Sequence, residues 1–329
     1  MKRGLTLLAA LPLLLAADGD VPELLLPVGC KIGQSCFIQH YVDVDPSAGA
    51  RDYRCGSART YDKHDGIDFR IRSMIQQRVG VPVLAAAHGT VINIRDGVRD
   101  ISVAVAGKAS VAGKECGNGV LIRHGEGVET QYCHLARGSV RVKPGETVSA
   151  GSVLGNVGMS GNAEFPHLHF IVRKGGKAID PFAYGAGAGL CAGGRNLWKE
   201  STELGLSYKA GEVINAGFAT EPLTMDAVQE RGDNQQPRPT RQSPLLVAFV
   251  QAIGLEGGDV QVLNVSAPDG STLSENRAAP LDRNKAQWLI FAGKKRQASL
   301  WPAGRYSARY QLIRKGKVVI DRRFAITLD

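Results

Sequence analysis

The chain has few aromatic residues and no long apolar run beyond its first 17 residues. Phenylalanine, tryptophan and tyrosine make up only 6% of the 329 residues, while glycine occurs 40 times, which favours turn-rich β structure over a helical bundle. No internal stretch reaches the roughly 18 apolar residues of a membrane-spanning helix, so a multi-pass membrane protein is excluded. A composition with 43% hydrophobic and 22% charged residues excludes a mainly disordered chain.

Three further absences limit the kinds of site and partner that we expect. No two cysteines are separated by only two residues, so we do not expect a zinc site built from cysteines. The basic residues are scattered and no nucleic-acid motif is present, so the net charge of +9 does not indicate a nucleic-acid partner. No histidine follows His169, and we therefore expect the chemistry before that point.

The first 17 residues have the pattern of a secretory signal peptide. Lys2 and Arg3 precede an apolar run, Leu5–Ala17, that is too short to span a membrane and contains Pro12. No cysteine follows directly, which argues against a lipid anchor. We expect an exported protein, periplasmic or extracellular, with no transmembrane span after signal removal. Its remaining charge of +7 suits an environment of anionic envelope polymers.

Six cysteines in an exported chain indicate disulfide bonds. Cys116 and Cys133 flank an expected hairpin with its turn near residues 124–127, so we predict that they pair. A weaker expectation covers the remaining four: Cys36 with Cys55, and Cys30 with Cys191.

Composition shifts divide the rest of the chain into four parts. Residues 18–60 form a cysteine-containing lead-in. Residues 61–185 contain short apolar runs, such as Ile101–Ala106, broken by glycine turns, which predicts an antiparallel β domain. A Gly/Ala-rich stretch, 186–200, indicates a linker. Evenly spaced strand-like runs in residues 201–329 predict an immunoglobulin-like β-sandwich, so the predicted fold class is all-β.

Two histidines near the end of the first β domain are candidates for chemistry. His167 and His169 lie two residues apart in an apolar run, and side chains at i and i+2 of a strand share a face. Leu168 and Phe170 would then pack on the opposite face. Two adjacent imidazoles can supply two metal ligands, or one ligand and one acid–base group.

A histidine and a carboxylate four residues apart, His64 and Asp68, also share one face of an extended strand. Gly66 between them lets the backbone pass close to another segment. With one histidine of the later pair they form a two-histidine, one-carboxylate set, which suits catalytic zinc. The same set is also suited to ferrous iron. By its parity Asp65 points to the opposite face, so we expect it on the surface.

His134 lies in an apolar strand-like segment, where a histidine alone is more often structural. The other candidate residues make it a candidate too. A metal-bound water needs a base, and a tetrahedral intermediate needs hydrogen-bond donors. Histidine can do either near neutral pH. The other histidines, His40, His88 and His124, match no such pattern and are expected to be surface or packing residues.

Taken in order, these segments resemble the lysostaphin-type (LytM-type) zinc endopeptidases, which cut peptide cross-links in bacterial peptidoglycan. That family shows HxxxD with a central glycine, then Tyr-x-His-Leu, then His-Leu-His-Phe. The three motifs occur here at residues 64–68, 132–135 and 167–170. Three flanking segments are also similar to the family: residues 83–91, 142–158 and 178–181. The resemblance covers about residues 60–185 and implies an antiparallel β domain of the duplicated hybrid motif type.

The resemblance also implies roles for five residues. His64, Asp68 and His169 would bind one zinc ion, and His134 and His167 would stand beside the metal-bound water. One of that pair would take and return the proton while the other stabilises the oxyanion, and we favour His167 as the base.

Two segments depart from the family pattern. Residues 160–166 replace a short Ser/Thr-Gly-Pro sequence, and residues 72–80 belong to a stretch that is longer than usual. Both are expected to line the groove, so they bear on the substrate and not on the metal.

Three functions fit these observations. The first is an exported zinc endopeptidase that acts on peptidoglycan peptides, and the second is a catalytically silent zinc-binding activator of another cell-wall hydrolase. The third is a peptidase of extracellular protein such as elastin. Silent members usually lose metal ligands, whereas every expected position is filled here, so we predict the enzyme.

The roles of the flanking regions stay open. The C-terminal region would bind substrate or other cell-envelope proteins, or would be purely structural. Trp288 and Trp301 would either stack on carbohydrate or, as is commoner, pack in a core. Residues 18–60 would either occlude the groove as an inhibitory segment or leave it open.

Overall fold

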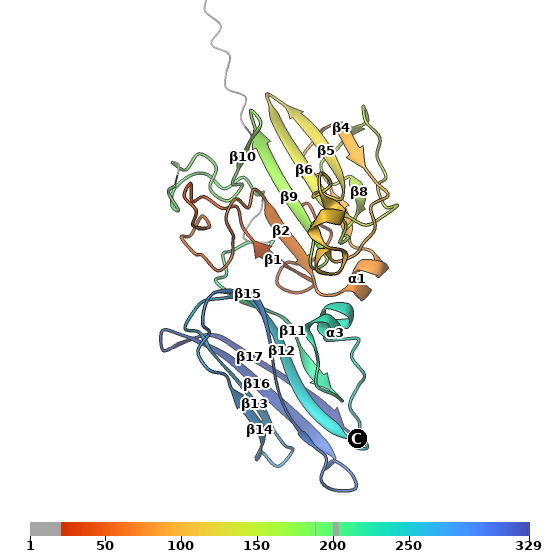
Figure 1. Cartoon of the computed structure of the whole chain (residues 1–329), viewed down its shortest axis with the longest axis vertical. Helices are drawn as coiled ribbons and strands as arrows, with labels where there is room; N and C mark the ends of the chain where they lie inside the picture. The colour runs from red at the N-terminus through yellow and green to blue at the C-terminus, as the bar shows by residue number, and fades with distance from the viewer. Residues whose placement is uncertain (1–20, 188, 200–203) are drawn as a thin grey trace, which may run out of the picture.

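The computed structural model describes residues 21–187, 189–199 and 204–329, so the expected signal peptide lies outside the described residues. The chain folds into two stacked parts, both built mainly from antiparallel strands (Figure 1). The all-β prediction is therefore confirmed. Among the described residues, no helix is long and apolar enough to cross a membrane.

The first part is organised around an eight-stranded antiparallel sheet with the order β1-β2-β9-β6-β5-β4-β7 and with β10 beside β9. The strands are β1 (Cys36–His40), β2 (Ile67–Ile71), β4 (Gly89–Arg95), β5 (Asn118–Gly125), β6 (Val128–Leu135), β7 (Thr147–Val148), β9 (His167–Lys174) and β10 (Lys177–Ile179). A small separate sheet pairs β3 (Pro82–Leu84) with β8 (Val153–Asn156). The adjacent strands β2, β9 and β6 carry most of the candidate residues.

The pairing of β2 with β9 sets the orientation of those residues. Asp68 lies opposite His169, and Arg70 lies opposite His167. The intervening residues of β9 alternate to the other face, where Leu168 is fully buried in the core. The expected alternation of β9 is therefore confirmed.

The hairpin of β5 and β6 and its disulfide are as predicted. Glu126 and Gly127 have φ angles of 48° and 71°, which are typical of the type I′ turn that joins two-residue hairpins. Cys116 and Cys133 form a disulfide at the base of this hairpin. The other predicted pairings are wrong, because the bonds run between Cys30 and Cys36 and between Cys55 and Cys191. A tight turn before β1 returns Cys36 to Cys30, which sequence distance alone does not reveal.

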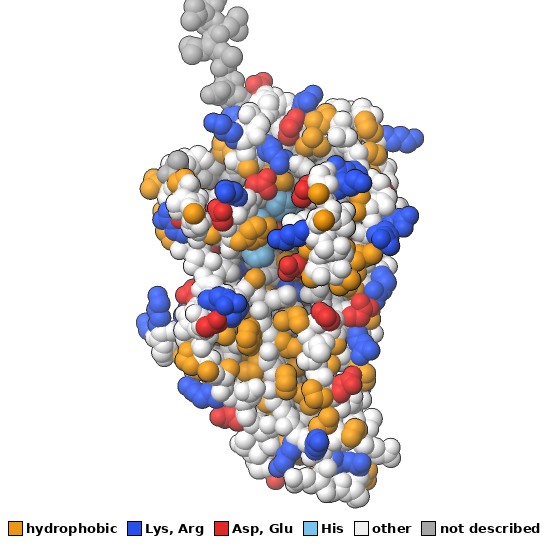
Figure 2. Space-filling view, in the orientation of Figure 1, with side chains coloured by type: hydrophobic (Ala, Val, Ile, Leu, Met, Phe, Trp, Pro, Cys, Tyr) orange, Lys and Arg blue, Asp and Glu red, His pale blue; other side chains and the backbone are white. Residues whose placement is uncertain are grey.

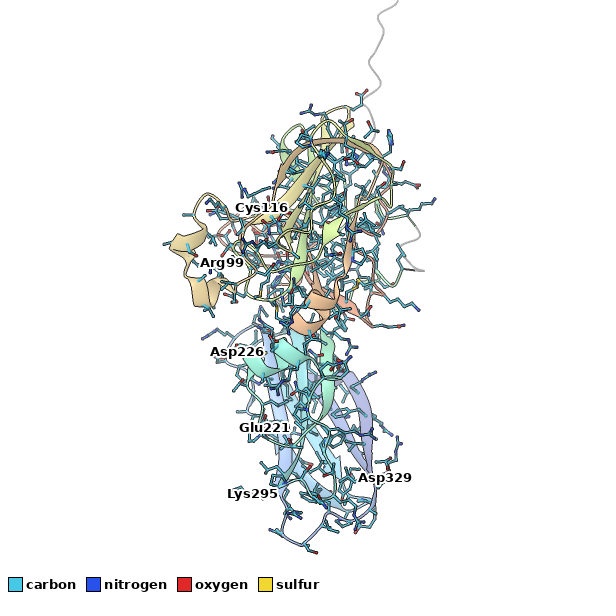
Figure 3. The ribbon with its side chains drawn as sticks, turned by 90° about the vertical axis from the view of Figure 1, so that its right-hand side faces the viewer. Arg99, Cys116, Glu221, Asp226, Lys295 and Asp329 are labelled. Carbon is cyan, nitrogen blue, oxygen red and sulfur yellow. A yellow bond between two sulfur atoms is a disulfide. The ribbon has the colours of Figure 1, made fainter. Side chains whose placement is uncertain are left out.

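One expected strand is a helix. The run Ile101–Ala106 contains α2 (Val103–Ala106) and is followed by a 3₁₀ turn, η1 (Lys108–Val111). Ser102 begins the helix by accepting a hydrogen bond from the backbone N–H of Ala104. This segment lies near the labelled Arg99 in Figure 3, and none of the described strands pairs with it.

The stretch 72–80 also differs from expectation. It contains α1 (Met74–Val79), which packs against α3 (Met225–Arg231) of the second part. Figure 3 shows Asp226, on α3, at the junction of the two parts. The long stretch therefore serves the contact between the two parts and does not line the groove.

The second part is a seven-stranded β-sandwich of immunoglobulin-like arrangement. One sheet has the order β11-β12-β15 and the other the order β14-β13-β16-β17. The strands are β11 (Glu212–Ala219), β12 (Leu245–Leu255), β13 (Val260–Ser266), β14 (Thr272–Arg277), β15 (Lys285–Lys295), β16 (Gly304–Arg314) and β17 (Lys317–Leu328). Trp301 is buried in the core between the sheets, and Trp288 packs partly against it. The interpretation of these tryptophans as core residues is therefore favoured.

The described residues of the predicted lead-in and of the predicted linker both pack with the eight-stranded sheet. In the predicted lead-in, β1 pairs with β2, and Leu24 lies in the same core. In the predicted linker, Leu197 and Trp198 are buried in that core as well, and Trp198 forms a β-bridge with Leu24. The predicted domain boundaries remain predictions, but neither segment is a free spacer.

Candidate active site

Three side chains converge on the open face of the larger sheet. His64 comes from the turn before β2, Asp68 from β2 and His169 from β9. Oδ1 of Asp68 lies 3.2 Å from Nε2 of His64 and 2.8 Å from Nδ1 of His169, and the two nitrogens are 3.2 Å apart. Two ligands of a tetrahedral zinc ion lie about 3.3 Å apart when the metal–nitrogen bonds are about 2.0 Å long. The three donor atoms are thus spaced as zinc ligands are.

The two histidines of this set are held by their other ring nitrogens. Nδ1 of His64 lies 2.7 Å from the carbonyl oxygen of Tyr41, and Nε2 of His169 lies 3.2 Å from Oδ1 of Asp65. Metal-bound histidines characteristically donate their second N–H to a carbonyl or a carboxylate. The hydrogen-bond pattern therefore fits a metal site.

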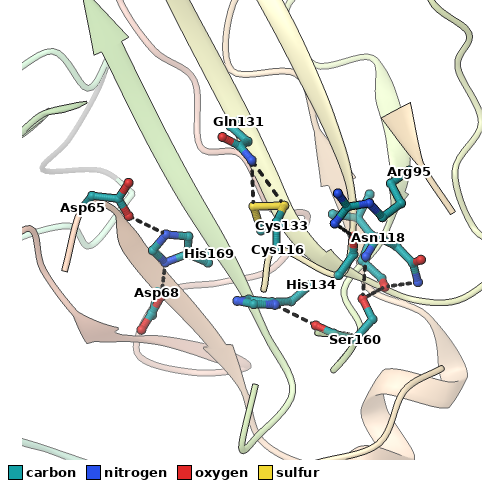
Figure 4. The surroundings of a disulfide bond; sticks show 12 residues. Asp65, Asp68, Arg95, Cys116, Asn118, Gln131, Cys133, His134, Ser160 and His169 are labelled. Atoms are coloured by element: carbon teal, nitrogen blue, oxygen red, sulfur yellow. Dashed lines mark hydrogen bonds and ion pairs between the residues drawn. A yellow bond between two sulfur atoms is a disulfide. The ribbon is translucent and has the colours of Figure 1, made fainter. Parts of the chain in front are cut away.

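Asp65 lies at the surface as expected, with 46% of its side chain exposed, but it contacts His169 and does not point to the opposite face. It precedes β2, which begins at Ile67, so the alternation of the strand does not extend to it. Its carboxylate contacts His169 (Figure 4). The same carboxylate lies 3.2 Å from Nη2 of Arg173. Burial alone would lower the pKa of His169, but Asp65 and Asp68 outweigh it and raise that pKa to about 9.

Sequence reasoning also missed His40. Its Nδ1 lies 2.8 Å from Oδ2 of Asp68, the oxygen that does not face the two histidine ligands. Burial opposes ionisation of Asp68, but the surrounding histidines outweigh it and hold its pKa well below the usual value. The apolar run Cys36–Val42 could have indicated a strand here, but nothing in it indicates a contact with Asp68.

Gly66 is required by the crowding at this site. A Cβ at Gly66 would lie 2.7 Å from the carbonyl oxygen of Phe170 and 2.8 Å from the ring of His169. No side chain fits at such distances. Only glycine therefore allows the segment that joins His64 to Asp68 to pass this close to β9. The expectation of a close backbone approach is confirmed.

His134 and His167 lie beside the three-residue set, with ring centroids 4.6 Å apart. Nδ1 of His134 is 2.7 Å from the carbonyl oxygen of Ser160, and Nδ1 of His167 is 2.8 Å from that of Phe165. Each Nδ1–H can therefore donate to the backbone, which leaves each Nε2 as an acceptor. Burial lowers the pKa of His167 to about 4 and that of His134 well below its usual value, so both are neutral at pH 7.

The backbone at His134 is itself unusual. Its φ angle is 64°, in the left-handed region that non-glycine residues rarely adopt. Its N–H donates to the carbonyl oxygen of Cys116, 2.8 Å away, and Cys116 is bonded to Cys133, the residue before His134 (Figure 4). The disulfide and this hydrogen bond fix the orientation of the histidine.

All five candidate residues line one groove with a volume of about 920 Å³. In Figure 2 the histidines are visible at the bottom of a hollow between two lobes of the first part, just above the sandwich. Three residues of the loop 160–166 line the groove, as expected, namely Asn162, Glu164 and Phe165, and so does the disulfide of Cys116 and Cys133. The remaining histidines lie elsewhere: His88 is exposed, and His124 contacts the carbonyl oxygen of His88.

Residues 62–181 match the family described as Peptidase family M23. The chain contains an M23 peptidase domain. The matched residues of this domain include all five candidate site residues, but neither His40 nor the sandwich.

Two curated relatives match this chain over 127 and 117 residues, so the matched part is less than a quarter of each relative's own length. "DD-carboxypeptidase/endopeptidase Mpg" of Neisseria meningitidis is 34% identical over 127 residues, which are 37% of this chain and 23% of that protein. "Peptidoglycan DD-endopeptidase ShyA" of Vibrio cholerae is 29% identical over 117 residues, 36% of this chain and 22% of that protein. The catalytic domain of the M23 protein EnpA from Enterococcus faecalis has 26% identity and a TM-score of 0.30, covering 44% of this chain and 92% of that one.

Proposed function

We propose that the M23 domain is a zinc-dependent endopeptidase that hydrolyses peptide bonds in the stem peptides or cross-links of peptidoglycan. The observation that carries this proposal is the convergence of three metal-type donors with two further histidines whose Nδ1 atoms are bonded to backbone carbonyls, so that their Nε2 atoms can accept protons. The relative named as a peptidoglycan DD-endopeptidase supports the substrate class.

The donor set suits zinc better than a hard cation. Two imidazole nitrogens and one carboxylate oxygen are ligands that zinc prefers, and three protein ligands leave a coordination position open. When bound there, zinc would supply Lewis acidity and lower the pKa of a coordinated water to about 7. Asp68 stays ionised and the hydrogen bonds of His64 and His169 fix their rings, so the protein presents the ligands in one orientation.

We assign the proton transfers to His167 and the stabilisation of the oxyanion to His134. Nε2 of His167 lies 3.6 Å from Oδ1 of Asp68, at the edge of the ligand set, where it can take a proton from the attacking water. The imidazolium can then protonate the leaving amine. Because neutral His134 presents only a lone pair at Nε2, it can stabilise an oxyanion only when that nitrogen is protonated.

We also propose that the protein works outside the cytoplasm. The signal peptide pattern in residues 1–17 predicts export, and all six cysteines form disulfides, which persist in oxidising compartments. The positive net charge would favour contact with anionic polymers of the cell envelope.

Digestion of purified sacculi, read by mass spectrometry of the released muropeptides, tests the function. We expect new peptide ends from the zinc-loaded protein and none after chelation. His167→Ala and His134→Ala should each lower the rate by about 10²-fold or more while zinc is retained. His64→Ala should lose zinc, and His124→Ala, whose ring lies outside the groove, is the matched control.

A different set of results would contradict the proposed endopeptidase activity. A protein that holds one zinc ion per chain, releases no new peptide ends and tolerates His167→Ala in vivo would not be an enzyme. It would instead fit the silent activator of another hydrolase. Cleavage of glycine-rich protein peptides in preference to muropeptides would point to an extracellular protein substrate.

A further inference from the structure

One end of the groove is formed by the sandwich and not by the M23 domain. The residues that line the groove include Asn284–Gln287, where β15 begins, together with His40 and Phe165 of the first part. Figure 1 shows this end of β15 directly beneath β1. A peptide lying in the groove would therefore meet the second part of the chain.

A buried hydrogen-bond chain holds this segment in place. Nε2 of Gln39 donates to the carbonyl oxygen of Ala286 at 2.8 Å, and Oε1 of Gln39 accepts from Nη1 of Arg70 at 2.9 Å. The guanidinium of Arg70 lies 4.2 Å from the ring centroid of Phe165, and the carbonyl of Phe165 orients His167. Gln39 and Arg70 are almost completely buried, so the sandwich is fixed relative to the proposed base.

A second contact joins the segment to the side of the groove. Nδ2 of Asn284 lies 2.9 Å from Oγ of Ser57, which also lines the groove, and Oδ1 of Asn284 accepts from the N–H of Gly257. The adjacent Lys285 is held by Asp282 at 2.6 Å. The segment is thus anchored on both sides and has the rigidity of a wall.

We propose that Asn284–Gln287 form an end wall that limits how far a peptide can extend on that side of the bond to be cleaved. The inference rests on the proposed function. An extended peptide advances about 3.3 Å per residue, so a fixed wall admits only a set number of residues. Such a groove selects short peptide branches over continuous protein chains.

A length series of peptides tests the wall in the full-length protein. The series keeps one scissile bond and adds residues to one side or the other. For the wild type we expect cleavage to fall beyond a fixed length on one side only. Ala286→Trp should shorten that limit by at least about one residue and lower kcat/KM for the longest accepted peptide about tenfold or more. Its matched control is Ala298→Trp, at an exposed position between β15 and β16 outside the groove.

A second variant loosens the wall without filling the groove. Gln39→Glu keeps an acceptor for Arg70 but removes the donor to Ala286, so longer peptides should become acceptable. An unchanged melting temperature confirms that the variant is folded. Identical length profiles for the wild type, Ala286→Trp and Gln39→Glu would contradict the proposal of an end wall.

Failure of the proposed function gives a different result. If the wild type cleaves no member of the series, the endopeptidase proposal fails. Binding of the same peptides to the zinc-stripped protein then tests the wall by calorimetry. Ala286→Trp should weaken binding of the longer peptides at least about tenfold relative to Ala298→Trp, and equal affinities would overturn the wall.

Discussion

His40 lies behind the candidate metal ligands and holds one of them. It bonds Oδ2 of Asp68, while Oδ1 of the same carboxylate faces His64 and His169. A carboxylate tied at one oxygen cannot rotate freely, so its other oxygen stays directed at the metal position. Partners of this kind typically change metal affinity by about 10–100-fold when they are removed.

We therefore expect His40→Ala to weaken zinc binding by about tenfold or more, with little loss of helix or strand content. Competition with a chromogenic chelator measures this affinity without requiring catalysis. His124→Ala removes a histidine that is hydrogen-bonded to a backbone carbonyl outside the groove, and it should leave the affinity unchanged. Equal zinc affinities for both variants would mean that the contact between His40 and Asp68 does not position the ligand.

The two kinds of site residue differ in how visible they are in the sequence. HxH places its two side chains on one face of β9, and HxxxD places His64 in the turn that leads into β2 and Asp68 on that strand, so residues close in sequence meet at the site. His40 reaches Asp68 only because β1 pairs with β2 in a register that makes the two residues direct partners. Such a register depends on the turn that leads into β1, and no spacing in the sequence encodes it.

At the scale of elements, the hairpin of β5 and β6 is a support for His134. The disulfide of Cys116 and Cys133 joins the incoming segment of the hairpin to the strand that carries this histidine. It holds the carbonyl of Cys116 within 2.8 Å of the N–H of His134. A backbone with φ of 64° persists at a non-glycine residue only where its surroundings impose it.

Replacing both cysteines with serine should therefore affect catalysis as well as stability. A bond closing a loop of this length contributes about 3 kcal/mol to the free energy of unfolding. We further expect kcat on muropeptides to fall about tenfold or more, because His134 loses its fixed orientation. Thermal unfolding and steady-state kinetics on the same preparation separate the two effects.

The matched control is the double serine variant of Cys30 and Cys36. This disulfide spans only six residues and lies outside the groove, so its loss should lower stability and leave kcat unchanged. If both double variants lose stability and neither loses kcat, the hairpin disulfide is only a structural bond.

The elements that sequence analysis found are those with local signals. Turn residues predicted the hairpin at Glu126 and Gly127, and alternation predicted β9. The run Ile101–Ala106 alternates too, yet it forms α2 because no strand is available beside it. Strand formation requires a partner, and partner availability is a property of the whole sheet.

At the scale of the whole molecule, the two parts share a small apolar contact. Phe37 of β1 packs with Ile214 of β11 and Ile253 of β12, and all three side chains are almost completely buried. Next to this cluster, Nη1 of Arg72 lies 2.7 Å from Oδ2 of Asp233. The sequence predicted both parts but not this junction, because its residues come from segments that each look complete alone.

The junction makes a prediction about cooperative unfolding. Truncation of a buried phenylalanine typically costs about 3–5 kcal/mol, and Phe37→Ala should lower the free energy of unfolding by about 3 kcal/mol. Because the cavity opens between the two parts, amide exchange should rise in β11 and β12 as well as in β1. Hydrogen exchange with mass spectrometry resolves these strands.

Phe291→Ala provides the comparison, because Phe291 belongs to the sandwich but is 42% exposed. Its truncation should cost less than about 1 kcal/mol and leave exchange in β1 unchanged. If Phe37→Ala raises exchange in β1 while β11 and β12 keep their protection, the two parts unfold independently. The end of the groove would then be held by a separable unit, and the hydrogen bonds of Gln39 with Ala286 and of Asn284 with Ser57 would have to fix it.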